Sequence, residues 1–521
     1  MKFNWIYNKK PELTILEQIK NNRQINAEIL DTHLMTIPDP SLLKDLDKAA
    51  ERIITAVKNK EKIIIFGHDD LDGITSTYIL FDFLETIGSQ NHYYYIPNRL
   101  IENHGMQKGF LERVRRDKYD LVITVDNGIS DFKPIDKITA SNCDVIVTDH
   151  HLVRDRLPSA YAVINPKRSD CSFPFKMLAG VGVVYLLVLK LAEILGITTD
   201  NNYLFWVAVG SIADKVPMIN INRYFVKKVL DEWSSFNDPT IKLLAGVSQQ
   251  NRSHTSRLGI IRFIIRLLSN NQEENGENRS LNLLLSNIID KDIIYRQLLS
   301  DYQDVEKTID DLKKFLAGKV IQENCTSFVY YDVEDKIPLE YLGFGASYIT
   351  NHFKIPAVIL KEKNTSVVCE ARCSEGFNLI DAFNYCSDTL IQYGGHVKAA
   401  GFSAHPSSIQ AFLDKFNLYV EMHKENILKN KKIHIDAVIP ITKAAEFIDF
   451  LFTDFDFMQP YGEGNPSPFY LIEDYIPDKH QEILKIDNLD LLPRNKDTYD
   501  LVLKFNGAVI KIVDYQQKVV N

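Results

Sequence analysis

Carboxylate and imidazole side chains stand at the ends of several apolar runs in this sequence. Three of these runs are Ile63–Phe66, Leu121–Val125 and Val145–Thr148, which lead into GHDDLDG, DNG and DHH, and a fourth run closes with Asp214. The first three runs are typical of buried strands, and ligands of open α/β sheets bind at the carboxyl ends of strands. We therefore expect one site that contains His68, Asp70, Asp72, Asp126, His150 and Asp214.

This set of four carboxylates and two imidazoles suits Mn²⁺ or Mg²⁺ and, without a thiolate, is a poor structural zinc site. Six ligands exceed the need of one open catalytic ion, so we expect two ions about 3.5–4 Å apart, bridged by a carboxylate such as Asp126. In that arrangement a water attacks phosphorus and an imidazolium protonates the leaving oxygen. His151 is the candidate proton donor, because His150 is the better-placed ligand. Any one of these acids alone is more often a turn or cap residue.

The elements that must position this site are predicted from the alternation of strand and helix patterns. From about residue 46 to 235 the alternation indicates an α/β domain with a mainly parallel sheet and helices on both faces. Residues 1–45 are polar and are expected to be a docking segment. Within the α/β domain, Gly180-Val181-Gly182 opens an apolar helix, where the glycines serve either a phosphate or tight helix packing.

The rest of the chain divides into three further parts. Residues 236–325 read as a helical connector that includes a long amphipathic helix over Asp292–Ala317. Residues 326–430 contain short strands and a smaller α/β domain. Residues 431–521 are β-rich, and a small barrel of the OB type is one architecture that fits them. In the connector, Arg252, Arg257, Arg262 and Arg266 either line a nucleic-acid groove or form a solvated helix face.

Composition limits the class of protein. The chain has 521 residues, 45% hydrophobic and 25% charged, which is ordinary for a soluble protein of roughly three or four domains. It has neither an apolar stretch of membrane-spanning length nor a signal-peptide core near Met1, so we expect no membrane association and a cytoplasmic location. Its six scattered cysteines indicate reduced thiols. A net charge of −9 argues against non-specific coating of nucleic acid but permits a nucleic-acid enzyme.

The motifs around these residues resemble those of a known superfamily. The segments HDDLDG, VDNG, DHH and GSIAD resemble the four motifs of the DHH phosphoesterases, and Gly394-Gly395-His396 with Ala399–Gly401 resembles the glycine-rich motif of the DHHA1 domain. Within this superfamily the sequence is most similar to the RecJ single-stranded-DNA exonucleases, through the segments PNR (97–99), NPK (165–167) and YGEGNP (461–466). The resemblance implies a parallel-sheet DHH domain, a helical connector, a smaller α/β DHHA1 domain and a C-terminal β-rich domain.

The resemblance also implies an activity and residue roles. It implies Mn²⁺- or Mg²⁺-dependent 5′-to-3′ digestion of single-stranded DNA to mononucleotides, in DNA repair or recombination, with RNA left open as a substrate and no protein partner indicated. The implied metal ligands are Asp70, Asp72, Asp126, His150 and Asp214, with His68 as a further ligand, while Asp126 and His151 carry catalysis. The implied substrate contacts are Arg99, Arg372, Gly394, Gly395 and His396.

Four departures from the RecJ pattern stand out, one of which is a C-terminal β domain that is diverged or short. Glu370 and Cys373 replace the serines that usually flank the arginine at position 372, so a 5′-hydroxyl end is an alternative to a 5′-phosphate end. His68 stands where RecJ enzymes tend to have an acid. The stretch Ile260–Arg266 keeps its arginines but lacks the small residues usual there.

Two other functions are weighed beside the exonuclease. A phosphodiesterase of short oligonucleotides or cyclic dinucleotides would use the same chemistry, but such enzymes usually need only the two core domains. A catalytically inactive scaffold, like the DHH-related component of replicative helicases, belongs to a different class. Such scaffolds lose metal ligands, whereas every candidate ligand is present in this sequence.

Overall fold

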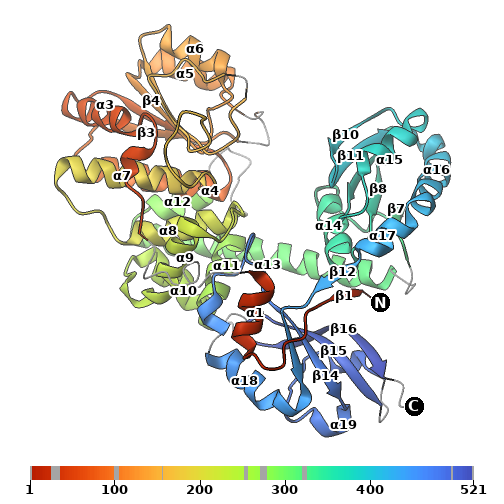
Figure 1. Ribbon diagram of the computed structural model, residues 1–521. Helices are drawn as coiled ribbons and strands as arrows, with labels where there is room; N and C mark the ends of the chain where they lie inside the picture. Colours follow the sequence, from red (N-terminus) through yellow and green to blue (C-terminus); the bar gives the residue numbers. More distant parts are fainter. Residues whose placement is uncertain are drawn as a thin grey trace.

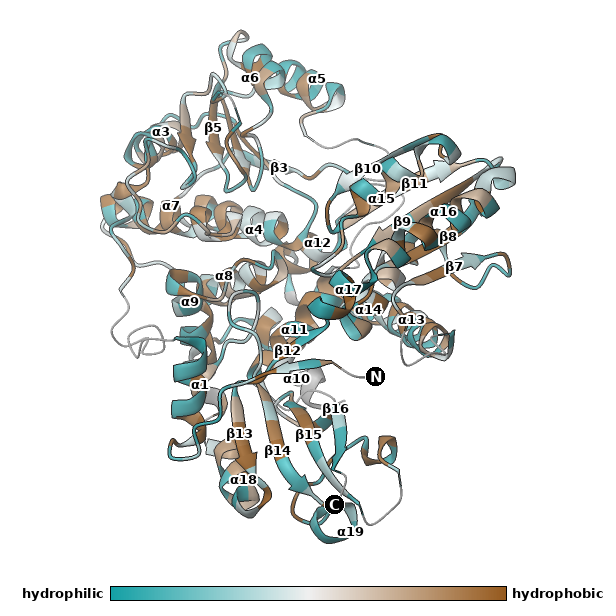
Figure 2. Cartoon of the chain, turned by 45° about the vertical axis from the view of Figure 1, so that its right-hand side comes forward, coloured by the Kyte–Doolittle hydropathy of each residue, from teal (hydrophilic) through white to brown (hydrophobic). Residues whose placement is uncertain are grey.

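The computed structural model contains two α/β lobes, a helical segment between them and a C-terminal β-rich part (Figure 1). The described residues are 3–24, 36–98, 102, 105–154, 156–250, 256–269, 278–319, 325–453, 455–493 and 497–518. Figure 2 shows that hydrophobic residues gather along the sheet strands and along α7, whereas α1 is mostly hydrophilic. Within the described part of the chain, no helix is long and apolar enough to cross a membrane.

The first lobe is built on a five-stranded sheet in the order β3-β2-β4-β5-β6, and all of its strand pairs are parallel. Its strands are β2 (Ile63–Phe66), β3 (His92–Tyr95), β4 (Leu121–Val125), β5 (Asp144–Thr148) and β6 (Ala162–Ile164). The central runs are buried on both faces, as is usual for parallel sheets. The parallel sheet predicted from the sequence is therefore confirmed.

Helices cover both faces of this sheet because successive strand side chains point to opposite sides. Ile63 and Ile65 pack into the main core with α3, α4 and α7, whereas Ile64 and Phe66 pack against α5 and α6. These helices are α3 (Leu46–Lys58), α4 (Leu71–Thr86), α5 (Lys108–Asp117), α6 (Phe132–Thr139) and α7 (Gly180–Leu195).

A run of helices joins the two lobes. These are α8 (Asn202–Ala213), α9 (Asn220–Asp231), α10 (Pro239–Gln250), α11 (Arg257–Leu268), α12 (Arg279–Leu285) and α13 (Ile288–Lys319). The long amphipathic helix expected over Asp292–Ala317 is confirmed as part of α13. Leu298 of α13 packs in the core of the first lobe, and Leu312 and Leu316 pack in the core of the second, so this helix connects them.

The second lobe has a five-stranded sheet in the order β10-β11-β9-β8-β7, with only β7 and β8 parallel. Helix α14 packs on one face, and α15 and α16 pack on the other. The strands are β7 (Phe328–Asp332), β8 (Ala357–Lys363), β9 (Ser366–Arg372), β10 (Gln392–His396) and β11 (Ala399–Ala404), and the helices are α14 (Leu342–Phe353), α15 (Leu379–Tyr385), α16 (Ile409–Met422) and α17 (Lys424–Asn430).

The C-terminal part is β-rich, as expected, but its sheet differs from a closed OB barrel. Strands β13 (Ala437–Pro440), β14 (Phe469–Tyr475), β15 (Thr498–Phe505) and β16 (Ile510–Lys518) form an open four-stranded sheet, in that order. Strands β13 and β14 are parallel and joined through helix α18 (Ala444–Thr453), which an antiparallel barrel meander would not contain. The apolar run of α18 was not recognised as a helix from the sequence.

The N-terminal segment docks on this C-terminal sheet. Strand β1 (Asn4–Ile6) pairs in parallel with β12 (Lys432–His434), and α1 (Ile15–Arg23) ends where Arg23 binds the carboxylate of Asp436. Trp5 donates its indole N–H to Asp514 over 2.9 Å. The two ends of the described chain therefore belong to one folded part.

A turn over residues 457–466 attaches this C-terminal part to the first lobe. The N–H of Met218 donates to the carbonyl of Glu463 over 2.7 Å. The fully buried Arg223 of α9 donates to the carbonyl of Met458 over 3.1 Å. The YGEGNP motif thus lies against the segment that follows Asp214.

Candidate metal centre

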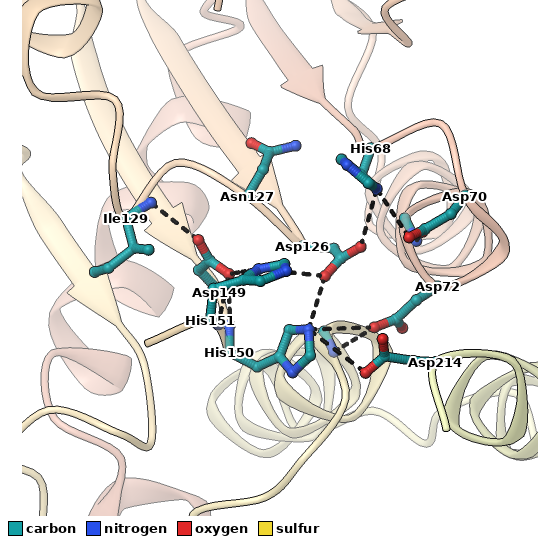
Figure 3. Close-up of polar contacts among 12 residues, drawn as sticks. His68, Asp70, Asp72, Asp126, Asn127, Ile129, Asp149, His150, His151 and Asp214 are labelled. Carbon is teal, nitrogen blue, oxygen red and sulfur yellow. Dashed lines mark hydrogen bonds and ion pairs between the residues drawn. The ribbon is translucent and has the colours of Figure 1, made fainter. Parts of the chain in front are cut away.

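Six candidate ligands converge at the carboxyl edge of the first sheet (Figure 3). Asp70 is the N-cap of α4, where its Oδ1 accepts a hydrogen bond from the N–H of Gly73 over 3.0 Å, and Asp214 is the C-cap of α8. The contributing elements are the ends of β2, β4 and β5 and the termini of α4 and α8, and the ligands are His68, Asp70, Asp72, Asp126, His150 and Asp214.

The candidate ligands form three overlapping clusters: His68 and Asp70 with Asp126, His150 and His151 with Asp126, and Asp72 and Asp214 with His150. The first cluster is one group, in which His68 Nδ1 lies 3.0 Å from Asp70 Oδ2 and 3.6 Å from Asp126 Oδ2. The other two clusters share His150 and form a second group, in which His150 Nε2 lies 3.1 Å from Asp126 Oδ1 and 3.6 Å from Asp214 Oδ2. In the second group Asp72 Oδ2 is 3.8 Å from the same nitrogen. The two oxygens of Asp126 therefore face two separate groups of candidate ligands.

The buried polar atoms of the second group fit a bound cation. Asp126 Oδ1 and His150 Nε2 are both buried and make no hydrogen bond, although they lie 3.1 Å apart. Buried polar atoms are normally hydrogen-bonded, so a pair that converges without a bond calls for another partner. Carboxylate oxygens and neutral imidazoles are ligands that Mn²⁺ accepts. The donor set therefore fits two divalent ions that share Asp126.

The charges of this cluster support the same assignment. Burial and the nearby charge of Asp70 raise the pKa of Asp72 to about 7. Burial and the charge of Asp72 raise the pKa of Asp214 to about 6, and the pKa of Asp126 lies well above its usual value for the same reasons. These carboxylates repel one another in a water-poor site, and a divalent cation would relieve that repulsion.

Close packing of α7 holds two of the acids in place. The N–H groups of Gly180 and Val181 donate to the carboxylate of Asp72 over 2.7 and 2.8 Å. A Cβ at Gly180 would lie 2.6 Å from the Cβ of Asp126, so only glycine allows this approach. Asp126 itself has a left-handed backbone with φ 60°. Of the two uses proposed for the glycines, a phosphate cradle or tight helix packing, the contacts of Gly180 show tight packing, which also positions Asp72 and Asp126.

His151 is held by a carboxylate that the sequence did not assign a role. Asp149 Oδ1 lies 2.8 Å from His151 Nδ1 and also accepts a hydrogen bond from the backbone N–H of that residue, while Oδ2 accepts from the N–H of Ile129. The hydrogen bond to Asp149 raises the pKa of His151, whereas burial lowers the pKa of His150. The His151 side chain is 54% exposed and that of His150 only 7%. The environment of His151 therefore suits a proton donor, and that of His150 suits a metal ligand.

A cavity of about 770 Å³ opens at this centre. Its walls include the candidate ligands His68 and Asp126 and the exposed His151, and Lys167 and Arg154 add positive charge. A cavity of this kind gives an anionic substrate access to the carboxylate cluster.

The candidate substrate residues Arg372, Gly394 and His396 of the second lobe lie on one face of its sheet, whereas Gly395 pairs with Ala400 at a position of the other face. Glu370 pairs with Gly401 and through it with Gly394, and Arg372 pairs with Ala399 and through it with His396. Gly394, Gly395 and His396 belong to the exposed edge strand β10 and not to a turn. Arg372 is half-buried and bound to Glu370. Arg99 lies outside the described residues.

The arginines of the connector have structural contacts. Arg262 donates to the carbonyl of Tyr461 over 2.8 Å, Arg257 donates to the carbonyl of Leu230, and Arg266 lies 3.9 Å from Glu306. Arg252 lies outside the described residues. Of the two roles expected, a groove or a solvated face, Arg262 and Arg257 show neither, because they tie helices to neighbouring segments.

Comparison with known proteins gives matches along most of the chain. Residues 62–211 match the family model described as DHH family, N-terminal domain. The single-stranded-DNA-specific exonuclease RecJ of Haemophilus influenzae is 30% identical over 432 residues, which cover 77% of this chain and 74% of that protein. The RecJ of Bacillus subtilis is 27% identical, over 84% of this chain but only 55% of its own length. The chain thus spans about half the length of that relative.

Solved structures agree with these sequence matches. The crystal structure of Thermus thermophilus RecJ in complex with Mn²⁺ matches 99% of this chain and 80% of its own, with a TM-score of 0.71 at 22% identity. A structure of exonuclease RecJ bound to manganese matches 73% of this chain and 95% of its own, with a TM-score of 0.57 at 26% identity.

The fold and the site define a class of protein first. A parallel sheet that gathers four acids and two histidines at its carboxyl edge, within a segment that matches the DHH model, is a DHH-type phosphoesterase domain. With 30% identity over about three quarters of both chains, this chain belongs to the RecJ family of single-stranded-DNA-specific exonucleases. The resemblance seen in the sequence motifs is confirmed.

Proposed function

We propose that this protein is a Mn²⁺- or Mg²⁺-dependent exonuclease that degrades single-stranded DNA from the 5′ end to mononucleotides. The observation that carries the proposal is the pair of ligand groups that meet at the two oxygens of Asp126. The similarity of the chain to RecJ proteins, two of them solved with manganese, supports the choice of substrate and ion.

Two sets of residues would hold the two ions. His68, Asp70 and Asp126 would hold one ion, and Asp72, His150 and Asp214 the other. Asp126 would be shared, because its Oδ1 lies 3.1 Å from His150 Nε2. When bound, the two ions neutralise the charge of the phosphodiester and lower the pKa of the attacking water.

His151 serves as the general acid. Asp149 binds Nδ1 of His151 and so orients the ring, and the protonated ring carries its second proton on Nε2. That proton is available to the leaving oxygen of the substrate. Asp149 thereby acts as a positioning residue and not as a ligand.

The domain roles follow from this assignment. Residues 46–235 form the DHH domain with the metal centre, 236–325 the connector, and 326–430 the DHHA1 domain, in which Arg372 and Gly394–His396, together with Arg99 of the DHH domain, hold the substrate. Residues 1–45 are an N-terminal segment and 431–521 a β-rich domain, and strand β1 of the first pairs with β12 of the second. All six cysteines are free, which supports a reducing compartment such as the cytoplasm.

The test uses single-stranded DNA labelled at the 5′ or the 3′ end and incubated with the protein and Mn²⁺. We expect immediate release of labelled mononucleotide from the 5′ end, while the 3′-labelled products form a slowly shortening ladder. The Asp126→Asn variant should leave both substrates intact. Loss of the 3′ label first, or cleavage of very short oligonucleotides only, would overturn the proposal in favour of a small-substrate phosphodiesterase. An RNA of the same sequence shows whether the 2′-OH is tolerated.

A further inference from the structure

Strand β6 is followed by a lysine, Lys167, that is not one of the candidate metal ligands. Residues Asn165-Pro166-Lys167 follow its last residue, Ile164, at the same sheet edge that carries the ligands. Lys167 lines the cavity together with His68, Asp126 and His151. The lobe therefore places a cation beside the carboxylate cluster.

The backbone at Lys167 is fixed by a fully buried amide. Asn165 Nδ2 donates to the carbonyl of His151 over 2.9 Å, and its Oδ1 accepts from the N–H of Lys167 over 2.8 Å. One side chain thus ties the loop that carries the general acid to the loop that carries the cation. The next residue, Arg168, is buried and held by Asp45 and Asp170, which makes the second loop rigid.

The ammonium of Lys167 has no ion-pair partner within 4.0 Å among the residues that the structure describes. The charges of Asp214 and Asp149 act on it from a distance, and partial burial lowers its pKa. A cation that is half removed from water and not neutralised in an open cavity is suited to bind an anion that enters.

We infer that Lys167 is a catalytic residue that binds a nonbridging oxygen of the scissile phosphate. This inference rests on the proposed phosphodiesterase function. Because His151 and Asp126 line the same cavity, a phosphate bound there by Lys167 would share the cavity with the general acid and the shared ligand. The ammonium then balances charge that builds on the phosphoryl oxygens as the bond to the leaving group breaks.

The experiment measures kcat and KM with Mn²⁺ for Lys167→Gln, Lys167→Arg and the control Lys137→Gln, which removes an exposed lysine of α6. The substrates are a single-stranded oligonucleotide and bis(p-nitrophenyl) phosphate, a phosphodiester without bases. Lys167→Gln should lower kcat/KM about 10- to 100-fold on both substrates, as expected for a lost hydrogen bond from a charged donor. Lys167→Arg should restore much of the loss, and the control should match the wild type.

Calorimetric titration with Mn²⁺ and thermal unfolding complete the test, because a contact to substrate changes neither. Unchanged kcat/KM in Lys167→Gln would overturn the inference. A lower kcat/KM on the oligonucleotide alone would also overturn it, because it would place Lys167 at a neighbouring phosphate. The same holds if a lower affinity for Mn²⁺ accounts for the lower rate. If the wild type hydrolyses the small diester but does not degrade DNA from its 5′ end, the proposed exonuclease function fails while the small diester still tests Lys167.

Discussion

Arg372 donates a hydrogen bond from Nη1 to Oε2 of Glu370 over 2.9 Å, so that an acid neutralises the arginine that shares a sheet face with Gly394 of β10. Both side chains lie against Gly343 of α14, where an added Cβ would be 3.0 Å from Arg372 Nη2 and 3.5 Å from Glu370 Oε2. A Cβ added at Gly394 would meet no atom within 4 Å. The face is thus accessible to a substrate end but carries little net positive charge.

We expect the protein to accept a 5′-hydroxyl end at least as well as a 5′-phosphate end. Replacing Glu370 with Gln keeps the size of the side chain and removes the charge that would repel a terminal phosphate. The ratio of kcat/KM for 5′-phosphorylated to 5′-hydroxyl DNA should rise about 10-fold, equal to about 1.4 kcal/mol. Glu421→Gln on α16 serves as the control, since Glu421 is exposed and pairs with Lys424. An unchanged ratio in Glu370→Gln would show that the 5′ end is bound elsewhere.

Gly180→Ala should damage the metal centre although residue 180 is not a ligand. The new methyl group would lie 2.6 Å from the Cβ and 3.0 Å from the Cα of Asp126, so α7 or the Asp126 loop must move. We expect at least a 10-fold loss of Mn²⁺ affinity by calorimetry and about 1–3 kcal/mol of lost stability.

Gly182→Ala is the matched control in the same helix. The nearest atom to its new methyl group is a side-chain carbon of Leu178 at 3.3 Å, which can shift slightly. Normal Mn²⁺ binding in Gly180→Ala would mean that the close approach of α7 is not needed to place Asp126.

His151→Gln and Asp149→Asn should slow turnover and leave metal binding largely intact. The first change removes the general acid, a loss of about 10² to 10⁴ in kcat, and the second releases the ring that Asp149 holds at 2.8 Å. The pH profile of kcat/KM in Asp149→Asn should shift to lower pH, because the hydrogen bond that raises the pKa of His151 is weakened. Calorimetry with Mn²⁺ checks the division of roles: if either variant no longer bound the ion, His151 would be a ligand instead.

The ligands could be predicted from the sequence because they lie just after a strand, at the start of helix α4 or at the end of helix α8, and local apolar runs mark these boundaries. Asp149 and Gly180 were missed as positioning residues because their roles depend on contacts across the fold. Asp149 reaches Ile129, and Gly180 reaches Asp72 and Asp126. Local sequence patterns do not indicate such contacts, although Asp149 lies in the DHH motif and Gly180 in the segment Gly180-Val181-Gly182, both noted from the sequence.

The structure of the C-terminal part could also be predicted only in part from the sequence. Its β-rich character is evident from short apolar runs, but strand β14 was not recognised, and the order of the strands depends on pairing between distant segments, including β1 with β12. The YGEGNP motif reads as a turn in sequence, and only the contact of Glu463 with Met218 shows that it packs against the first lobe. Register and docking of this kind are set by tertiary packing and not by local propensity.

Asp126→Asn provides the sharpest test of the shared ligand, because its two oxygens face both groups. An amide offers a single oxygen and no charge, so we expect hydrolysis to fall to background and calorimetry to show weak binding of both ions.

In the wild type, Mn²⁺ at about 100 times its Kd should stabilise the folded state by about 2.7 kcal/mol, an effect that the variant should lack. The metal-free variant should be at least as stable as the metal-free wild type, since it removes one of several buried like charges. Asp136→Asn on the exposed side of α6 is the control. Retention of one tight Mn²⁺ site with full activity in Asp126→Asn would show that a single ion suffices and that Asp126 bridges nothing.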